Sequence, residues 1–433
     1  MNEQQHIDAL IHAALGKHLH GDLDAAESAY REIVASFPAE PKVRHYLGFL
    51  LQQQDRLADA LEQMNIAIAL DDRHAEWHFN LGIVLSRLGH VARSIAAFSA
   101  AIEINPDGYF YWTNLGASFE RNGEAMRAEQ CYLAAASIDP GCPDAHYLLA
   151  ALYLKQERYA DARRCNALGV VAAPVQSVIV RGQAYHDLGR MDEAIELFEN
   201  RLAEYPGDPV ASHLLAAYRA NGAPDRCSRE YVERTFDAFA PSFDDILGRI
   251  KYCAPQLAAD YLSGLNISAG SLDVLDLGCG TGLVGERLRR YARAMSGVDL
   301  SCAMLDVAAG KKLYDRLYRS DIAEFLSQSR EKFDLVSCMD TFIYLGKLDD
   351  LVVQIYDRLK AGGHFVFSTE KLADFAPCGF RLNISGRYSH HRDYLSRLLN
   401  DAGFAVEQRF DIDIRMESGS PVAGEFICAR RTA

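Results

Sequence analysis

Three glycines at alternate positions, Gly278, Gly280 and Gly282, form the stretch of this 433-residue chain that carries the clearest chemical signal. They follow an apolar run, residues 274–277, that is typical of a short buried strand. Glycine lets the backbone turn sharply and approach a bound group closely, because it has no side chain to obstruct either. The stretch therefore predicts a ligand, and the residues around it must decide which one.

Three aspartates around the glycines narrow the choice among nucleotides, flavins and adenosylmethionine, all of which such loops serve. Asp299 ends the second predicted strand, 19 residues after Gly280, where it can accept hydrogen bonds from both hydroxyls of a ribose. Asp321 ends the third, where it can meet an adenine amino group while Ile322 packs on the ring. Asp276 lies inside the first strand, where a carboxylate would pair with a cationic amino group and repel a pyrophosphate. The structural alternatives are a helix cap for Asp299 and a solvated strand end for Asp321.

A predicted parallel sheet positions these residues. After Gly270 the chain alternates short apolar runs with longer helical patterns, which is typical of a sheet with helices on both faces. Residues 416–425, between the last two runs, are too few for a helical crossover, so those strands should pair antiparallel. The predicted strands span residues 273–279, 294–300, 317–321, 333–340, 364–370, 406–415 and 426–430.

A helix rich in aromatic residues precedes the sheet. Phe236, Phe239 and Phe243 are spaced by three and four, which places them on one stripe of a helix that Pro241 interrupts. Packing into the core would explain the stripe. A lid over a cofactor pocket needs the same aromatic residues, so both interpretations stand.

The combination of Asp276-Leu-Gly-Cys-Gly-Thr-Gly282, Gly297-Val-Asp299-Leu-Ser and Ser320-Asp321-Ile322 resembles the class I adenosylmethionine-dependent methyltransferases over about residues 230 to 433. The resemblance implies a Rossmann-like, doubly wound, seven-stranded domain that binds S-adenosylmethionine and releases S-adenosylhomocysteine. It implies these cofactor-binding residues: Asp276 at the methionine end, Gly278, Gly280 and Gly282 in the loop, Asp299 and Leu300 at the ribose, and Asp321 and Ile322 at the adenine.

The same resemblance implies where the methyl acceptor binds. Methyl transfer from a sulfonium is an in-line displacement, so the protein mainly aligns donor and acceptor and removes a proton where the nucleophile has one. Asp340, after the fourth strand, can accept that proton or instead cap the next helix. His390 can act as a general base or be an ordinary surface histidine, because residues 389–391 are predicted to open a helix. Tyr344, Arg387 and Tyr388 are further candidates for the acceptor pocket.

The first half of the chain is a repeat with a step of 34 residues, visible in the Leu-Gly pairs that end at Gly48, Gly82 and Gly116. A bulky residue follows each glycine by sixteen positions, at Met64, Phe98 and Tyr132. The pattern resembles the tetratricopeptide repeat, a pair of antiparallel helices. About six such pairs and a capping helix are predicted over residues 1–222, with residues 223–433 as the methyltransferase domain and an aromatic lid helix at 229–250.

Stacked helix pairs form a solenoid with a concave face, which suits an extended peptide or another protein. Asn80 and Asn114 precede their Leu-Gly pairs, where resemblance to peptide-binding repeats would put their amides on that face. Asn is also simply common at this position of the repeat. The join of repeats to the second domain further resembles bacterial methyltransferases with N-terminal tetratricopeptide repeats, on residues 236–244, 340–346 and 386–390.

Composition sets the remaining expectations. A formal net charge of −14 argues against general binding to nucleic acid or to an anionic membrane surface. We expect a cytoplasmic protein, because neither a secretory signal nor a membrane-spanning apolar run is visible. The ten cysteines are scattered without a Cys-x-x-Cys pair, which predicts reduced thiols and no metal site.

The sequence thus predicts an adenosylmethionine-dependent methyltransferase whose repeats recruit a peptide or protein as substrate or partner. Two alternatives stay open. One is a small-molecule methyltransferase whose repeats serve only assembly. The other is a scaffold that binds adenosylmethionine without turnover.

Overall fold

The computed structural model describes residues 3–173, 175–219, 224–265, 267–374, 376–417 and 420–432. The chain divides into two compact units, Met1–Gln176 and Ser177–Ala433, and each is described by itself. The expected repeat-ending Pro174 and the expected boundary residues 221–223 lie outside the described residues. The domain boundary between residues 222 and 223 therefore stays a prediction.

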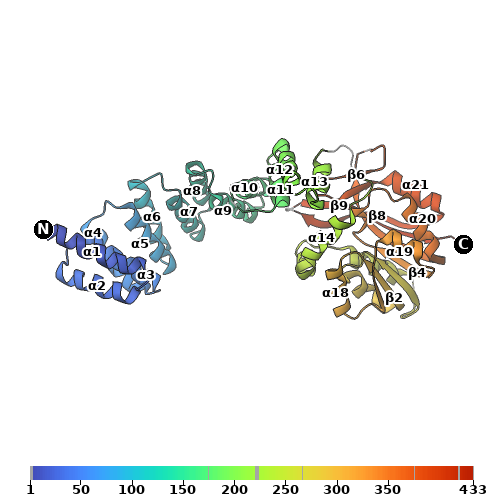
Figure 1. The fold of residues 1–433 in the computed structure, drawn as a ribbon, viewed down its shortest axis with the longest axis horizontal. Coiled ribbons are helices and arrows are strands. Elements are labelled where there is room, and N and C mark those ends of the chain that lie inside the picture. The colour runs from blue at the N-terminus through green and yellow to red at the C-terminus, as the bar shows by residue number, and fades with distance from the viewer. Residues whose placement is uncertain are drawn as a thin grey trace. The chain divides into compact units, whose positions relative to one another are not determined.

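The first unit is built from antiparallel helix pairs (Figure 1). Contact between the glycine and the bulky residue sixteen positions later explains their spacing in the repeat. A side chain at Gly48 would meet the Met64 side chain at 2.8 Å, and one at Gly82 would meet the Phe98 ring at 2.5 Å. The bulky residue therefore requires the glycine opposite it. The helices are α1 (Glu3–Leu19), α2 (Leu23–Ser36), α3 (Pro41–Gln53), α4 (Leu57–Leu70), α5 (Ala75–Arg87), α6 (Val91–Ile104), α7 (Tyr109–Arg121), α8 (Ala125–Ile138), α9 (Pro143–Lys155) and α10 (Tyr159–Ala172).

The two asparagines considered for peptide binding make contacts within the repeats. Asn80 is buried, and its Nδ2 lies 3.1 Å from Nε2 of His45 in the preceding repeat. Asn114 donates from Nδ2 to the carbonyl oxygen of Phe110 at 2.8 Å, one turn back on its own helix. Part of the hydrogen-bonding capacity of both amides is thus used in packing.

The second unit begins with a sixth helix pair, α11 (Val178–Asp187) and α12 (Met191–Glu204), and a lone helix α13 (Pro209–Arg219). From α1 to α13 the described residues thus contain six helix pairs and one further helix. Three segments follow: α14 (Arg229–Phe239), the 3-10 turn η1 (Ala240–Ser242) and α15 (Phe243–Arg249). The predicted interruption at Pro241 thus falls in η1.

A nine-stranded sheet in the order β3-β2-β1-β4-β5, with β9 and β8 beyond β5, forms the centre of this unit. All seven predicted strands are present, and β8 and β9 pair antiparallel as expected. The strands are β1 (Leu272–Leu277), β2 (Ala292–Asp299), β3 (Arg316–Arg319), β4 (Phe333–Cys338), β5 (Leu359–Leu372), β6 (Phe380–Leu382), β7 (Tyr388–His391), β8 (Phe404–Glu417) and β9 (Ser420–Arg431).

Helices cover both faces of the sheet, as a doubly wound fold requires (Figure 1). Alternation along β1 sends Val274 to one face and Leu275 and Leu277 to the other. Val274 packs in a cluster with α16 (Ala254–Gly264) and α17 (Leu283–Leu288). Leu275 and Leu277 pack in a cluster with α19 (Ile322–Gln328), α20 (Asp349–Arg358) and α21 (Arg392–Ala402). The fold also contains α18 (Cys302–Gly310) and the 3-10 turns η2 (Arg289–Tyr291) and η3 (Phe342–Tyr344).

Two short strands, β6 and β7, were not predicted, and one expectation here is wrong. Residues 389–391 do not open a helix but end β7, which pairs in parallel with residues 370–372 of β5. Helix α21 begins only at Arg392, with His391 as its N-cap. Ser389 and His390 are polar and yet buried, so the sequence did not show the apolar alternation that usually marks a strand.

The helices α11–α13 share a hydrophobic cluster with the β6–β7 insert. Phe198 and Leu214 pack in one group with Tyr231 and Tyr388. The Nε2 atom of His213 lies 2.9 Å from the carbonyl oxygen of Gly386, and the Tyr388 hydroxyl donates to the carbonyl of Pro224 at 2.6 Å. The sixth helix pair therefore belongs physically to the sheet domain.

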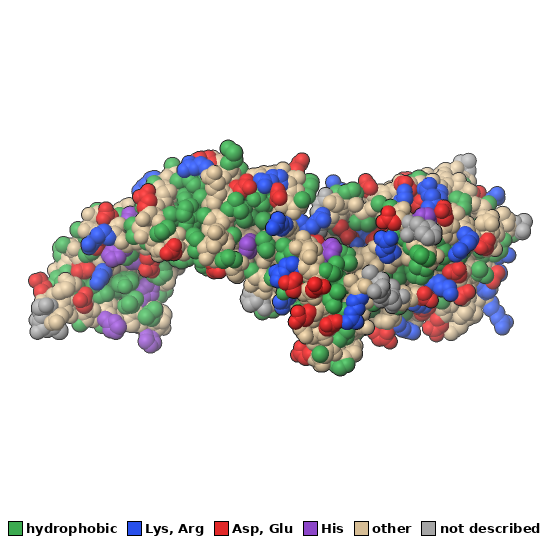
Figure 2. Space-filling model, turned by 90° about the horizontal axis from the view of Figure 1, so that it is seen from above, with side chains coloured by type: hydrophobic (Ala, Val, Ile, Leu, Met, Phe, Trp, Pro, Cys, Tyr) green, Lys and Arg blue, Asp and Glu red, His purple; other side chains and the backbone are tan. Residues whose placement is uncertain are grey.

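Surface charges in the second unit are mixed. On the face shown in Figure 2, acidic and basic side chains are interspersed over the sheet domain. Within the described part of the chain, no helix is both long enough and apolar enough to cross a membrane.

Candidate active site

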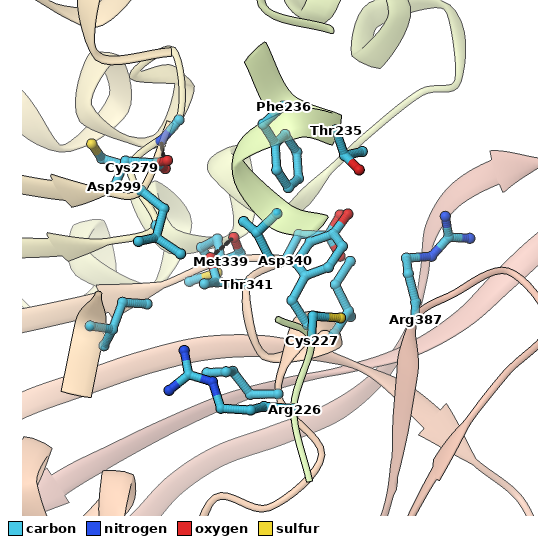
Figure 3. A pocket seen from close by; sticks show the side chains of 18 of the residues that line it. Arg226, Cys227, Thr235, Phe236, Cys279, Asp299, Met339, Asp340, Thr341 and Arg387 are labelled. Atoms are coloured by element: carbon cyan, nitrogen blue, oxygen red, sulfur yellow. Dashed lines mark hydrogen bonds between the residues drawn. The ribbon is translucent and has the colours of Figure 1, made fainter. Parts of the chain in front are cut away.

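A cavity of about 550 Å³ opens at the carboxyl ends of the central strands of the second unit. In parallel α/β sheets, ligands bind at this edge, where the strand order reverses. Its walls come from the glycine loop after β1, the ends of β2 and β4, the aromatic segment α14–α15 and the end of β8. Figure 3 shows Asp299 and Cys279 at one end of the cavity and Arg387 at the other.

The glycine loop has the backbone that its sequence predicts. Gly278, Gly280 and Gly282 have φ values of 69°, 53° and 91°, in the left-handed region that favours glycine. A side chain at Gly278 would collide with that of Thr341. Glycine at this position therefore also leaves room for the segment that follows β4. Gly278 and Gly280 line the cavity, whereas Gly282 caps the start of α17.

Asp299 links the loop to the end of β2. Its Oδ2 accepts a hydrogen bond from the Gly280 amide at 2.9 Å, and its Oδ1 accepts one from the Ser301 amide at 2.9 Å. Burial raises the pKa of its carboxyl group, although these amides oppose the rise. Asp299 and Leu300 both line the cavity, which fits the ribose position that the sequence predicts.

Asp276 lies beneath the loop and is not among the residues that line the cavity. It is only 1% exposed and accepts hydrogen bonds from the Tyr314 hydroxyl and the Ser337 hydroxyl, both at 2.7 Å. Burial raises the pKa of Asp276 to about 6. The carboxylate thus supplies negative charge under the loop, and the predicted direct contact with an amino group stays a prediction.

The raised pKa of Asp276 predicts a pH-dependent stability. The folded state takes up this proton more readily than the unfolded chain, so the free energy of unfolding falls as the pH rises from about 4 to about 6 and stays lower above pH 6. We expect Asp276→Asn, which stays neutral, to stabilise the cofactor-free protein by about 3 kcal/mol at pH 8 and by only about 1 kcal/mol at pH 4.5. Urea unfolding at both pH values measures this difference. A variant that is no more stable than the natural protein at pH 8 would contradict it.

Asp321 caps a helix and forms an ion pair. Its Oδ1 accepts from the amides of Ala323 and Glu324 at the start of α19, at 2.9 and 3.3 Å. Its Oδ2 pairs with the guanidinium of Arg226, a residue that sequence reasoning did not single out. Asp321, Ile322 and Arg226 all line the cavity, at the end predicted to hold adenine.

The segment that carries Arg226 is fixed against the stretch that follows β4. The Cys227 amide donates to the Tyr344 carbonyl at 2.9 Å, and the Gly346 amide donates to the Asp225 carbonyl at 2.8 Å. Nothing in the sequence pairs residues so far apart. Only the folded chain shows that the start of this segment forms a cavity wall.

The aromatic segment forms another wall of the cavity. Phe236 of α14 packs edge-on against Tyr344, with ring centroids 5.1 Å apart, and Figure 3 shows it facing the cavity. Two carboxylates hold the segment to the cofactor end. Asp237 accepts from the Ser301 hydroxyl at 2.5 Å, and Asp244 accepts from the Thr281 hydroxyl at 2.5 Å. The helix thus lies where a lid would lie.

The opposite end of the cavity contains a cluster of charged side chains. Arg415, only 3% exposed, donates from Nη1 to both oxygens of Asp340, at 2.9 and 3.0 Å, and from Nε to Glu417 at 2.6 Å. It also pairs with Glu370. Arg387 donates to Glu370 at 2.6 Å and to both oxygens of Glu417. We call these five residues the charged cluster.

Of the three predicted catalytic residues, the structure brings two together. Asp340 and Tyr344 line the cavity. Arg387 lines it as well, whereas Tyr388 is buried in the hydrophobic cluster with Leu214 and is not among the lining residues. Arg415 and Glu417, which line the cavity, were not predicted. Their signal in the sequence is faint, because Arg415 and Glu417 only continue the alternation of polar and apolar residues along β8.

His390 is not among the residues that line the cavity. Its ring is fully buried, with Nδ1 at 2.7 Å from the Thr369 hydroxyl and Nε2 at 2.9 Å from the Leu345 carbonyl. Burial lowers the pKa of His390 to about 4, so the ring is neutral near pH 7. The histidine holds the segment after β4 in place.

The second unit is thus a Rossmann-like domain with one large cavity at the carboxyl ends of its central strands. Comparison with known families agrees. Residues 232–409 match the methyltransferase domain family, and residues 47–109, 113–174 and 182–210 match tetratricopeptide repeat families. The chain therefore contains a methyltransferase domain preceded by tetratricopeptide repeats, and the cofactor of this domain is S-adenosylmethionine.

Curated relatives match part of the methyltransferase half. The chain is 31% identical over 99 residues to a ubiquinone biosynthesis O-methyltransferase of Coxiella burnetii, covering 22% of this chain and 42% of the relative. It is 28% identical over 179 residues to a malonyl-(acyl-carrier protein) O-methyltransferase of Priestia megaterium, covering 40% and 62%. The chain thus spans less than two thirds of the length of these relatives.

Among solved structures, the N-methyltransferase NodS of Bradyrhizobium japonicum WM9, in complex with S-adenosyl-L-homocysteine, is 17% identical with a TM-score of 0.38. The match covers 47% of this chain and 99% of that one. At this level of similarity we draw nothing about function from it.

Proposed function

We propose that this protein transfers a methyl group from S-adenosylmethionine to an acceptor that enters the cavity from the charged cluster. The observation that carries the proposal is that one cavity contains both halves of the site. Gly278, Gly280, Asp299 and Ile322 line one end, and Asp340 lines the other. A site for cofactor binding alone would not need the second half.

The residues have separable roles in this proposal. The cofactor supplies the methyl group on a sulfonium when it is bound. Asp299 accepts from the ribose hydroxyls, and Ile322 packs against the adenine. Asp340 receives the proton of the acceptor, because burial raises the pKa of its carboxyl group and makes it a better base than an exposed aspartate. Tyr344 forms a wall of the acceptor site, and His390 positions the segment that carries Tyr344.

The aromatic segment α14–α15 acts as the lid. Its aromatic side chains cover the cavity, and Asp237 and Asp244 latch it to Ser301 and Thr281, which flank the cofactor end. Closing the cavity excludes water and strengthens the electrostatic interactions within it.

The repeats recruit the substrate or a partner in this proposal. Stacked helix pairs present a concave face suited to a peptide or protein. A second candidate is a small-molecule methyltransferase whose repeats serve assembly. Two observations favour that candidate: the cavity is small, and the relatives named above are O-methyltransferases of ubiquinone biosynthesis and of malonyl-(acyl-carrier protein).

Transfer of label from methyl-labelled S-adenosylmethionine separates these candidates. The full chain and a fragment Ser177–Ala433, which lacks the first five repeats, are each incubated with lysate of the source organism. We expect label in a protein with the full chain, and at least tenfold less with the fragment, because recruitment is lost. Equal label in small molecules with both proteins would support the second candidate. No label in either fraction would contradict the transferase.

A further inference from the structure

The charged cluster carries more negative than positive charge. Asp340, Glu370 and Glu417 contribute three carboxylates, and Arg387 and Arg415 contribute two guanidinium groups, which leaves one negative charge in excess. Buried charges normally occur in neutralising pairs, since an uncompensated one is expensive to desolvate. An unbalanced cluster at a cavity wall therefore points to a ligand that supplies the missing positive charge or a hydrogen-bond donor.

The two guanidinium groups are already engaged by the protein. All three nitrogens of Arg415 donate to carboxylates of the cluster. Arg387 donates from Nε and Nη2 to two of the same carboxylates. An acceptor that arrived as a carboxylate would compete with these ion pairs and would add a second excess negative charge.

Asp340 is the member of the charged cluster whose sequence neighbour contacts the glycine loop. Its neighbour Thr341 packs so tightly on Gly278 that a side chain there would collide with it. Asp340 itself has a φ of 52°, a conformation that residues other than glycine rarely adopt. Its amide donates to the Ser368 hydroxyl at 2.9 Å, and Arg415 clamps both its carboxylate oxygens. The fold thus holds a strained aspartate, Asp340, between the glycine loop and the other four residues of the cluster.

The lid contributes a polar group to the same cavity. Thr235 of α14 lines the cavity, and its hydroxyl oxygen is buried without a hydrogen-bond partner among the described residues. Figure 3 shows Thr235 beside Phe236 on the lid helix. A buried hydroxyl without a partner is costly unless a ligand supplies one.

We propose, on the basis of the function proposed above, that the methyl acceptor is a group that still carries its proton, a hydroxyl or an amine, and that the charged cluster selects against carboxylate acceptors. In the transfer, a lone pair of the acceptor oxygen or nitrogen forms the new bond to the methyl carbon. The bond from that carbon to sulfur breaks and leaves a neutral thioether. The acceptor proton passes to Asp340, so charge and atoms balance.

Sinefungin tests the negative charge of the cluster without knowledge of the acceptor, because it has an amine-bearing carbon in place of the methyl-bearing sulfur of the cofactor. Its ammonium group reaches toward the acceptor, whereas S-adenosylhomocysteine has nothing there. Calorimetry on the full chain is expected to show sinefungin binding at least tenfold more tightly than S-adenosylhomocysteine. The preference should fall to threefold or less in Asp340→Asn, with the affinity for S-adenosylhomocysteine changed less than threefold.

A second variant guards against misfolding of Asp340→Asn, which loses part of its contact with Arg415. Glu417 is 37% exposed, so Glu417→Gln removes the excess charge with less disturbance and should also reduce the preference severalfold. Asp306→Asn, on the exposed side of α18, is the matched control and should retain the preference for sinefungin. Equal or weaker binding of sinefungin by the natural protein would overturn the inference. Failure to bind S-adenosylhomocysteine at all would instead overturn the proposed function.

Discussion

A fragment Pro224–Ala433 is expected to be about 5 kcal/mol less stable than a fragment Ser177–Ala433, although both contain the entire sheet. The difference between them is α11–α13, which cover Tyr231, Leu382 and Tyr388 in one hydrophobic cluster. Exposing each large side chain costs about 1.5 to 3 kcal/mol. Domains have only about 5 to 15 kcal/mol of stability in total, so the shorter fragment should be largely unfolded or aggregated.

Urea unfolding followed by circular dichroism measures this difference, with the longer fragment as the matched control. Both fragments keep residues 225–227, whose backbone pairs with the stretch after β4, so loss of that contact cannot account for the result. Equal unfolding midpoints would show that the sixth helix pair is dispensable to the sheet domain. They would also support a domain boundary at residues 222 and 223.

Replacing Asp299 by alanine is expected to weaken the binding of S-adenosylmethionine by roughly 100-fold or more. Each hydrogen bond from a ribose hydroxyl to a carboxylate contributes about 1.5 to 3 kcal/mol, and two of them are lost. The same carboxylate accepts from the amides of Gly280 and Ser301, so the loop also loses a support. Calorimetry with S-adenosylmethionine and with S-adenosylhomocysteine measures both effects.

Asp306→Ala is the control for Asp299→Ala, because Asp306 is an exposed aspartate on α18. It removes the same charge from the same region and should leave affinity within about twofold, in line with the small effects of exposed substitutions. If Asp299→Ala kept the affinity of the natural protein, the ribose assignment would be wrong.

Much of the fold could be predicted because its patterns are local. The 34-residue repeat, the alternating apolar runs and the antiparallel last strands all follow from neighbours along the chain, and the structure confirms them. The strands β6 and β7 were not predicted because Ser389 and His390 are polar residues buried by contacts with distant segments. No sequence pattern within residues 380–391 indicates those contacts.

The same distinction holds for the candidate site: residues in local motifs could be predicted, and residues held by long-range contacts could not. Gly278, Gly280 and Asp299 belong to two short local motifs, and all three line the cavity. Arg415 could not be found, because its partners Asp340 and Glu370 lie 75 and 45 positions away. His390 was attractive as a titrating residue, but burial and two backbone carbonyls take it out of the cavity. Which charged side chains pair across a sheet depends on the folded structure and not on their spacing along the chain.

The latches on the aromatic segment have a kinetic consequence. In the proposed function donor and acceptor share one cavity, whose wall α14–α15 is held by Asp237 and Asp244 to Ser301 and Thr281. In the proposed function the segment covers the bound cofactor, so we expect its opening to set the pace of turnover, with methyl transfer itself the faster event. A partner that shifted the resting position of the segment would then change the rate of turnover.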